Sequence, residues 1–241
     1  MQTDDLLTYL FDGQPHLLFQ PMARWLASSR RFTAFVTDFQ NKIRKKLRTT
    51  QDQESLLDLQ LELETAYYLL QERSLSVVYE PELSRGIRSP DFAVTFTTSL
   101  TFMLEVTRVQ ADPQNAWNAR LADTVSAKLG QLLPQCSNIV LIGTEVADSS
   151  ELRAAMLGLQ QRAERNDLTF LQRHGFRDRA DFFHHYQRLS EILVRGLPFD
   201  VTKAIIPWIN PQAKYPLPGK VRTALHRSQT SGSEIKRSLR I

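Results

Sequence analysis

The segment from residue 91 to residue 109 constrains the fold more than any other part of the chain. Residues 91–96, DFAVTF, alternate between large apolar side chains and polar or small ones, which predicts a strand with one buried face. Residues 97–99, TTS, are suited to a turn, and residues 100–109, LTFMLEVTRV, read as a returning strand. The sequence therefore predicts an antiparallel hairpin.

The turn also predicts the register of this hairpin. If Phe96 pairs with Leu100, Asp91 lies opposite Glu105, and the two carboxylates can share a ligand. The same register gathers the apolar side chains of both strands on one face, which supports it. Two facing carboxylates repel each other unless a cation lies between them. The competing interpretation is a polar, solvent-facing side of the hairpin, and for Glu105 alone it is equally good.

The elements around the hairpin predict an α/β sandwich, in which a mixed sheet lies between helices. The last predicted strand contains Pro207, which indicates an edge position or a bulge. Helices are expected in residues 1–50, 51–73, 112–134 and 149–165 and near 181–186, and further strands at 75–80, 138–145, 189–196 and 202–210. We expect a helical N-terminal region at 1–50, a main domain at 51–218 and a flexible basic tail at 219–241.

Length and composition exclude several classes of protein. A chain of 241 residues suits one α/β domain with additions. No apolar run approaches the ~20 residues of a membrane span, and the first ten residues lack the basic start of a signal peptide, so we expect a cytoplasmic protein without a membrane partner. The single cysteine, Cys136, excludes an intrachain disulfide and a cysteine-rich zinc site.

Positive charge is concentrated in two segments. Residues 41–48 hold five basic residues and no acid, and residues 219–241 hold six basic residues and one acid. The rest of the chain has 19 basic residues (30 − 5 − 6) and 25 acidic ones (26 − 1), so it is acidic. Basic patches of this kind attract polyanions such as nucleic acid. The alternative is an ordinary solvated surface.

A lysine falls on the apolar face of the helix that follows the hairpin. Leu121, Val125, Lys128 and Leu132 are separated by four, three and four residues, so they share one side of a helix. A lysine at an inward position needs an anionic partner there. Otherwise its stem must carry the amine out to solvent.

An acid falls on an apolar helix face before the hairpin. Leu59, Glu62, Ala66 and Leu69 are separated by three, four and three residues, which places Glu62 on their stripe. An acid at the edge of the stripe that reaches water is the equally good alternative. Glu64 is the competing candidate, and the pattern places it on a more polar face.

The hairpin motif resembles a known family signature. Pro90-Asp91, followed after the short hairpin by Glu105-Val106-Thr107, resembles the motif of the PD-(D/E)xK superfamily, the restriction-endonuclease-like nucleases. The resemblance covers roughly residues 55–145 and extends weakly to 216. It implies that Asp91 and Glu105 bind Mg²⁺, or Mn²⁺ in its place, and that a metal-activated water hydrolyses DNA or RNA. No glycine-rich phosphate loop, nucleophile elbow or dinucleotide fingerprint competes with it.

The sequence departs from this signature at one position. Thr107 stands where the family motif has lysine, and a hydroxyl group cannot supply the positive charge. Family variation implies that Lys128 replaces this lysine from the following helix and that Glu62 is an additional catalytic and metal-binding acid. Arg108 points to the face opposite Glu105 and is expected to brace the sheet. The alternative function is an inactive nucleic-acid-binding or scaffold module that keeps the fold.

Overall fold

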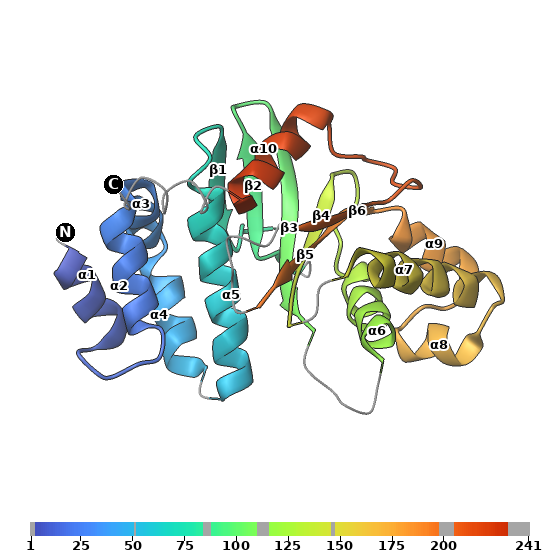
Figure 1. Cartoon of the computed structure of the whole chain (residues 1–241), viewed down its shortest axis with the longest axis horizontal. Coiled ribbons are helices and arrows are strands. Elements are labelled where there is room, and N and C mark those ends of the chain that lie inside the picture. The colour runs from blue at the N-terminus through green and yellow to red at the C-terminus, as the bar shows by residue number, and fades with distance from the viewer. Residues whose placement is uncertain are drawn as a thin grey trace.

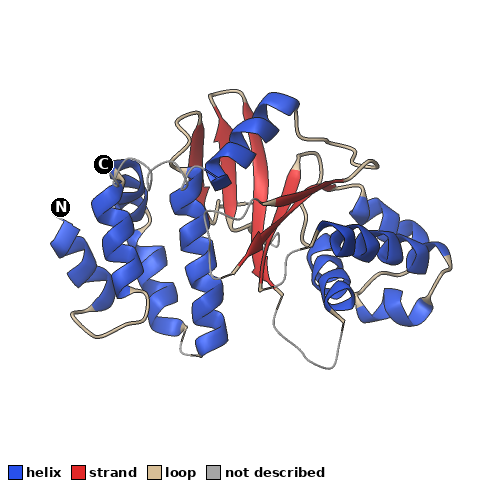
Figure 2. Ribbon diagram, viewed as in Figure 1, coloured by secondary structure: helices blue, strands red, loops and turns tan. Residues whose placement is uncertain are grey.

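A six-stranded sheet forms the centre of the molecule, with helices on both of its faces (Figure 1). The computed structural model describes residues 3–50, 52–83, 88–109, 116–145, 148–197 and 205–230. Figure 2 shows the sheet between two groups of helices. The predicted α/β class with a mixed sheet is confirmed.

The strands follow one another across the sheet in the order of the sequence. The first three form an antiparallel meander, the third, fourth and fifth are parallel, and the sixth returns antiparallel at the edge. Phe96 pairs with Leu100, as predicted, and Pro207 lies in the edge strand. The strands are β1 (Leu75–Tyr79), β2 (Phe92–Phe96), β3 (Leu100–Arg108), β4 (Asn138–Thr144), β5 (Leu189–Gly196) and β6 (Ile206–Ile209).

The N-terminal helices and the C-terminal helix cover one face of the sheet. Their buried side chains join Phe102, Leu104 and Val106 of β3 in a single apolar core. Residues before position 50 therefore share a core with the sheet. These helices are α1 (Thr3–Phe11), α2 (Phe19–Ser28), α3 (Arg30–Asp38), α4 (Gln40–Thr49), α5 (Gln53–Leu69) and α10 (Gly219–Thr230).

Four helices cover the other face. Leu121 and Val125 pack there with Val140 and Ile142 of β4, because alternate residues of a strand point to opposite faces. The helices are α6 (Trp117–Leu129), α7 (Ser149–Glu164), α8 (Leu168–Arg173) and α9 (Arg179–Tyr186). Every helix in the described part of the chain is too short or too polar to cross a membrane.

The prediction of a flexible C-terminal tail is wrong for α10. This helix lies against α5, and its Val221 and Leu225 are buried. Arg222 donates a hydrogen bond of 3.1 Å to the buried carboxylate of Glu191 on β5. The basic residues of this segment suggested a solvated tail, and the spacing of four residues between the buried Val221 and Leu225, which is typical of a helix, was not used. The prediction for residues 231–241 lies outside the described residues.

Candidate active site

Asp91 lies immediately before β2, where three strands meet. Its Oδ2 accepts a hydrogen bond of 2.7 Å from the backbone N–H of Val106, and its carbonyl oxygen accepts one of 2.8 Å from the N–H of Glu80. The paired register of β2 and β3 runs from Phe92 opposite Leu104, so Asp91 lies beside Glu105. Backbone hydrogen bonds therefore hold this carboxylate at the β2–β3 boundary.

Lys128 reaches Glu105 from α6. The Lys128 Nζ lies 3.0 Å from Oε2 of Glu105, and the two side chains are 16% and 5% exposed. The apolar neighbours of Lys128 hold α6 against the sheet, so its amine points inward, as its stripe position predicted. Thr107 lies two residues beyond Glu105 on the same strand and therefore on the same face.

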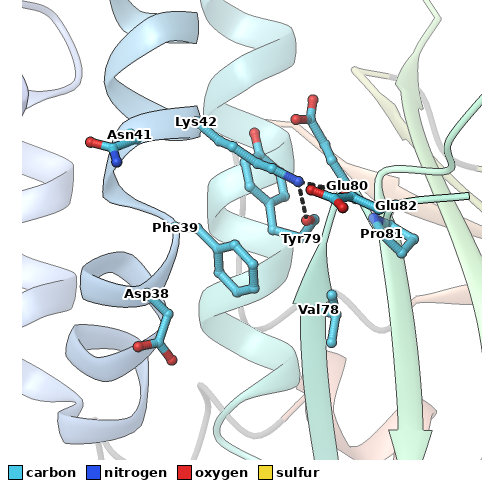
Figure 3. Close-up of a pocket in the computed structure, with 9 residues that line it drawn as sticks. All are labelled: Asp38, Phe39, Asn41, Lys42, Val78, Tyr79, Glu80, Pro81 and Glu82. Atoms are coloured by element: carbon cyan, nitrogen blue, oxygen red, sulfur yellow. Dashed lines mark hydrogen bonds between the residues drawn. The ribbon is translucent and has the colours of Figure 1, made fainter.

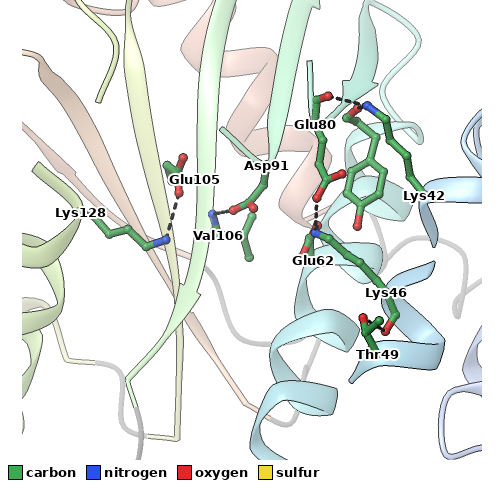
Figure 4. A network of polar contacts seen from close by, with 10 residues as sticks. Lys42, Lys46, Thr49, Glu62, Glu80, Asp91, Glu105, Val106 and Lys128 are labelled. Carbon is green, nitrogen blue, oxygen red and sulfur yellow. Dashed lines mark hydrogen bonds and ion pairs between the residues drawn. The ribbon is translucent and has the colours of Figure 1, made fainter. Parts of the chain in front are cut away.

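A second lysine contacts two acids on the other side of Asp91. Lys46 Nζ of α4 lies 2.6 Å from Oε1 of Glu62 and 2.8 Å from Oε1 of Glu80. Figure 4 shows this group on one side of Asp91 and the Glu105–Lys128 pair on the other. Asp91 is thus the carboxylate between two lysine-bearing helices that cover opposite faces of the sheet.

Sequence reasoning missed Glu80 and Lys46. Glu80 ends the first predicted strand, and pairing that strand with the hairpin would have placed it near Asp91. Lys46 belongs to the basic run that we interpreted as a surface for polyanions. Its position gave no signal, because the acids that it binds come from α5 and from the end of β1.

The pKa values of the three candidate acids, Asp91, Glu62 and Glu105, are all raised above their usual values. Burial raises the pKa of Asp91, although the Val106 N–H and both lysines oppose the shift. Burial, followed by the negative charge of Asp91, raises the pKa of Glu62 to about 7 and also raises the pKa of Glu105. Removal of carboxylates from water without enough nearby cations is the physical cause.

The donor set fits a hard divalent cation. Asp91 Oδ1 and Glu105 Oε1 make no hydrogen bond within the described residues, whereas the second oxygen of each is engaged. Within those residues, no group of three or more acidic, histidine or cysteine side chains is arranged to hold a metal. Two carboxylates suit Mg²⁺, which completes its shell with water and phosphate oxygens. The role of Glu62 as a metal ligand stays a prediction, because its Oε1 contacts Lys46.

Two other sequence expectations have different outcomes. Arg108 lies 2.5 Å from Glu54 and 3.3 Å from Asp58, so it links β3 to α5 on the face opposite Glu105, as expected. The expected polar environment of Glu64 is wrong. Glu64 is buried, and its Oε2 lies 2.8 Å from the guanidinium of the buried Arg195 on β5.

Most basic residues of the run on α4 have partners within the protein. Arg44 and Arg48 both pair with Asp12, and Lys46 pairs with the two acids of the site. The Lys42 amine donates to backbone carbonyl oxygens at the end of β1. The interpretation of this run as a polyanion-binding surface is therefore weakened.

A hollow of about 390 Å³ opens beside Glu80, between α4 and the end of β1. Figure 3 shows the ring of Phe39 and the side chain of Lys42 along its wall, with Asn41 at one end. The carboxylates of Glu80 and Glu82 also belong to its lining. Through Glu80 the hollow adjoins the acidic cluster.

Comparison with known proteins identifies no relative of this chain. No family model, curated protein or solved structure matches it. The assignment of a function therefore depends on the geometry of these side chains.

Proposed function

We propose that this chain is a metal-dependent nuclease with a restriction-endonuclease-like fold, which hydrolyses phosphodiester bonds of DNA or RNA. Asp91 and Glu105 are its ligands for Mg²⁺ or Mn²⁺. The contact of 3.0 Å between Lys128 and Glu105 is the observation that carries this proposal. It brings a partly buried ammonium group to the carboxylate pair of the hairpin, as the strand lysine of the family motif would.

Each residue has a defined task in the proposed reaction. The Val106 N–H already fixes the orientation of the Asp91 carboxylate, so little conformational entropy is lost when its other oxygen binds the metal. The Lys128 amine orients the attacking water and offsets negative charge that develops on the phosphate. Glu62, with a pKa of about 7, can accept a proton near neutral pH. When bound, the metal ion stabilises phosphate charge and lowers the pKa of its water.

The hollow beside Glu80 gives the substrate room next to the scissile bond. Glu80 and Glu82 repel a phosphate there, so a base or a sugar is the better occupant. Phe39 offers an aromatic ring on which a base can stack. We assign this hollow to a nucleotide that flanks the cleaved phosphodiester.

A cleavage assay with purified protein tests the proposal. Single-stranded DNA, double-stranded DNA and RNA are incubated with the wild type in Mg²⁺, in Mn²⁺ and in EDTA. We expect metal-dependent cleavage of at least one substrate and none with Asp91→Asn. Glu164→Gln, which changes an exposed acid at the end of α7, is the control and should cleave like the wild type. Activity in EDTA, or full activity of Asp91→Asn, would contradict the proposal.

The second candidate function is an inactive module that binds nucleic acid or serves as a scaffold. Thr107 favours it, because the strand position of the family lysine carries no charge. Fold alone does not establish catalysis. The two functions differ in metal binding, since an inactive module does not need the ion. A wild type that binds neither Mg²⁺ nor Mn²⁺ in calorimetry and cleaves no substrate would favour the module.

A further inference from the structure

The Lys46 ammonium group occupies a position that is typical of a shared cation. It lies 2.6 Å from a Glu62 oxygen and 2.8 Å from a Glu80 oxygen, so one positive charge joins two carboxylates. The side chain of Lys46 is 28% exposed and that of Glu62 is 12% exposed. Water therefore screens this contact less than it would screen a pair on the open surface.

The aromatic ring of Tyr79 also favours a cation at the position of the Lys46 amine. The Tyr79 side chain is fully buried, and its ring lies under the Lys46 amine, 4.8 Å from the ring centroid. The Tyr79 hydroxyl lies beside the Glu62 carboxylate, and burial, followed by the negative charge of Glu62, raises its pKa well above the usual value. A buried phenolic oxygen next to the Glu62 and Glu80 carboxylates is a further potential ligand for an ion.

The backbone of Glu80 is held in an unusual conformation at this place. Its φ is 43°, in the left-handed region that residues other than glycine seldom adopt. The Asp91 carbonyl accepts from its N–H at 2.8 Å, and the Lys42 amine donates to its carbonyl at 2.7 Å. Such strain persists only where surrounding contacts fix it, and it is concentrated at functional sites. The Glu80 carboxylate is thereby turned toward Lys46.

We propose that Lys46 is a built-in cation that fills a second metal position between Glu62 and Glu80, so that the site takes only one divalent ion, at Asp91 and Glu105. This inference rests on the proposed function for the first ion. When Asp91, Glu105, Glu62 and Glu80 are all ionised, they carry four negative charges, and Lys46 and Lys128 offset two of them. The two remaining negative charges (4 − 2) match one divalent cation. Without Lys46, three negative charges remain, and two carboxylates lose their cation.

The number of bound Mn²⁺ ions tests this inference without any measurement of cleavage. Wild type, Lys46→Met and Lys45→Met are titrated with Mn²⁺ by calorimetry, and bound Mn²⁺ is counted by electron paramagnetic resonance. We expect one ion in the wild type, two in Lys46→Met and one in Lys45→Met, which removes an exposed lysine of the same helix. Adding Glu80→Gln to Lys46→Met should return the number to one.

Thermal unfolding gives a second readout. Mn²⁺ should raise the Tm of Lys46→Met more than it raises the Tm of the wild type, because two ions bind the folded state. If Lys46→Met does not fold without metal, Lys46→Gln takes its place, since an amide can still hydrogen-bond to both carboxylates without carrying a charge.

The possible outcomes separate this inference from the nuclease proposal. One ion in both the wild type and the Lys46 variant overturns the inference and leaves the nuclease proposal intact. Two ions in the wild type also overturn it. No ion in the wild type but one in the variant supports the role of Lys46 and contradicts the metal site at Asp91 and Glu105. No ion in either protein contradicts both.

Discussion

The two lysines on either side of Asp91 differ in the number of carboxylates that they contact. Lys128 comes from α6 and contacts Glu105 alone, at 3.0 Å. Lys46 comes from α4 and contacts both Glu62 and Glu80. The first side therefore retains carboxylate oxygens for a ligand, whereas the second side is closed by an ammonium group of the protein itself.

This difference shows that a basic residue must be judged by what it contacts. Lys46 belongs to a run of five basic residues, yet it is used inside the molecule. Lys128 stands apart from other basic residues and reaches the acid pair. An exposed charge run contributes through long-range attraction, whereas a partly buried lysine that contacts an acid acts on specific atoms.

Changes at Asp91, which both sides share, should have the largest effect. Asp91→Asn removes the charge but keeps an oxygen that can accept from Val106 N–H. We expect loss of all metal-dependent cleavage with unfolding free energy in EDTA equal to or above that of the wild type, because a buried carboxylate is replaced by a neutral group. Asp91→Ala loses the hydrogen bond as well and should cost about 1–3 kcal/mol. Equal Mn²⁺ affinity in wild type and Asp91→Asn would refute the ligand assignment.

Lys128→Met tests the side that is open to a ligand. It keeps much of the stem volume and removes the ammonium group, so cleavage should fall about 10²–10³-fold if Lys128 stabilises charge in the transition state. Adding Thr107→Lys should restore part of the rate, because both positions lie on the Glu105 face. A purely structural role for Lys128 would give reduced stability in urea unfolding but no rescue by Thr107→Lys.

Glu62→Gln tests the side of the site that Lys46 closes, through the dependence of the unfolding free energy on pH. The folded-state pKa of Glu62 is about 7, above its usual 4.5, so the folded protein holds this proton more tightly than the unfolded chain. The resulting stabilisation is present below pH 4.5 and is lost as the pH rises to about 7, a loss on the order of 3 kcal/mol. In EDTA, the variant should therefore gain stability relative to the wild type between pH 5 and 7.5. A constant difference across this range would contradict the assignment.

The smallest expected effect concerns the basic residues outside the site. Truncation after Thr230 removes Lys236, Arg237 and Arg240. If these residues contact phosphates, the slope of log affinity against log salt should become shallower by about 2–3 units. Lys45→Met should change it by about one unit at most, because the other basic residues of its helix bind partners within the protein. Nucleic-acid binding that is independent of salt would return both segments to the solvated-surface interpretation.

Local patterns in the sequence were sufficient for much of the site. The alternation of β2 and β3 and the length of their turn predicted the register that places Asp91 beside Glu105. Helical spacing predicted that Lys128 points inward, because apolar neighbours at three and four residues define the buried face. Both inferences need only the period of a single element and its nearest partner.

Only the tertiary structure decided which distant segments meet at Asp91. The contacts of Lys46 with Glu62 and Glu80 join three elements that are far apart in the chain, and no local period encodes such an approach. The same reason explains the errors at Glu64, which is buried in an ion pair with Arg195, and at α10, which folds against α5. A charge is solvated or buried according to what packs over it, and that depends on the assembly of the whole sheet with its helices.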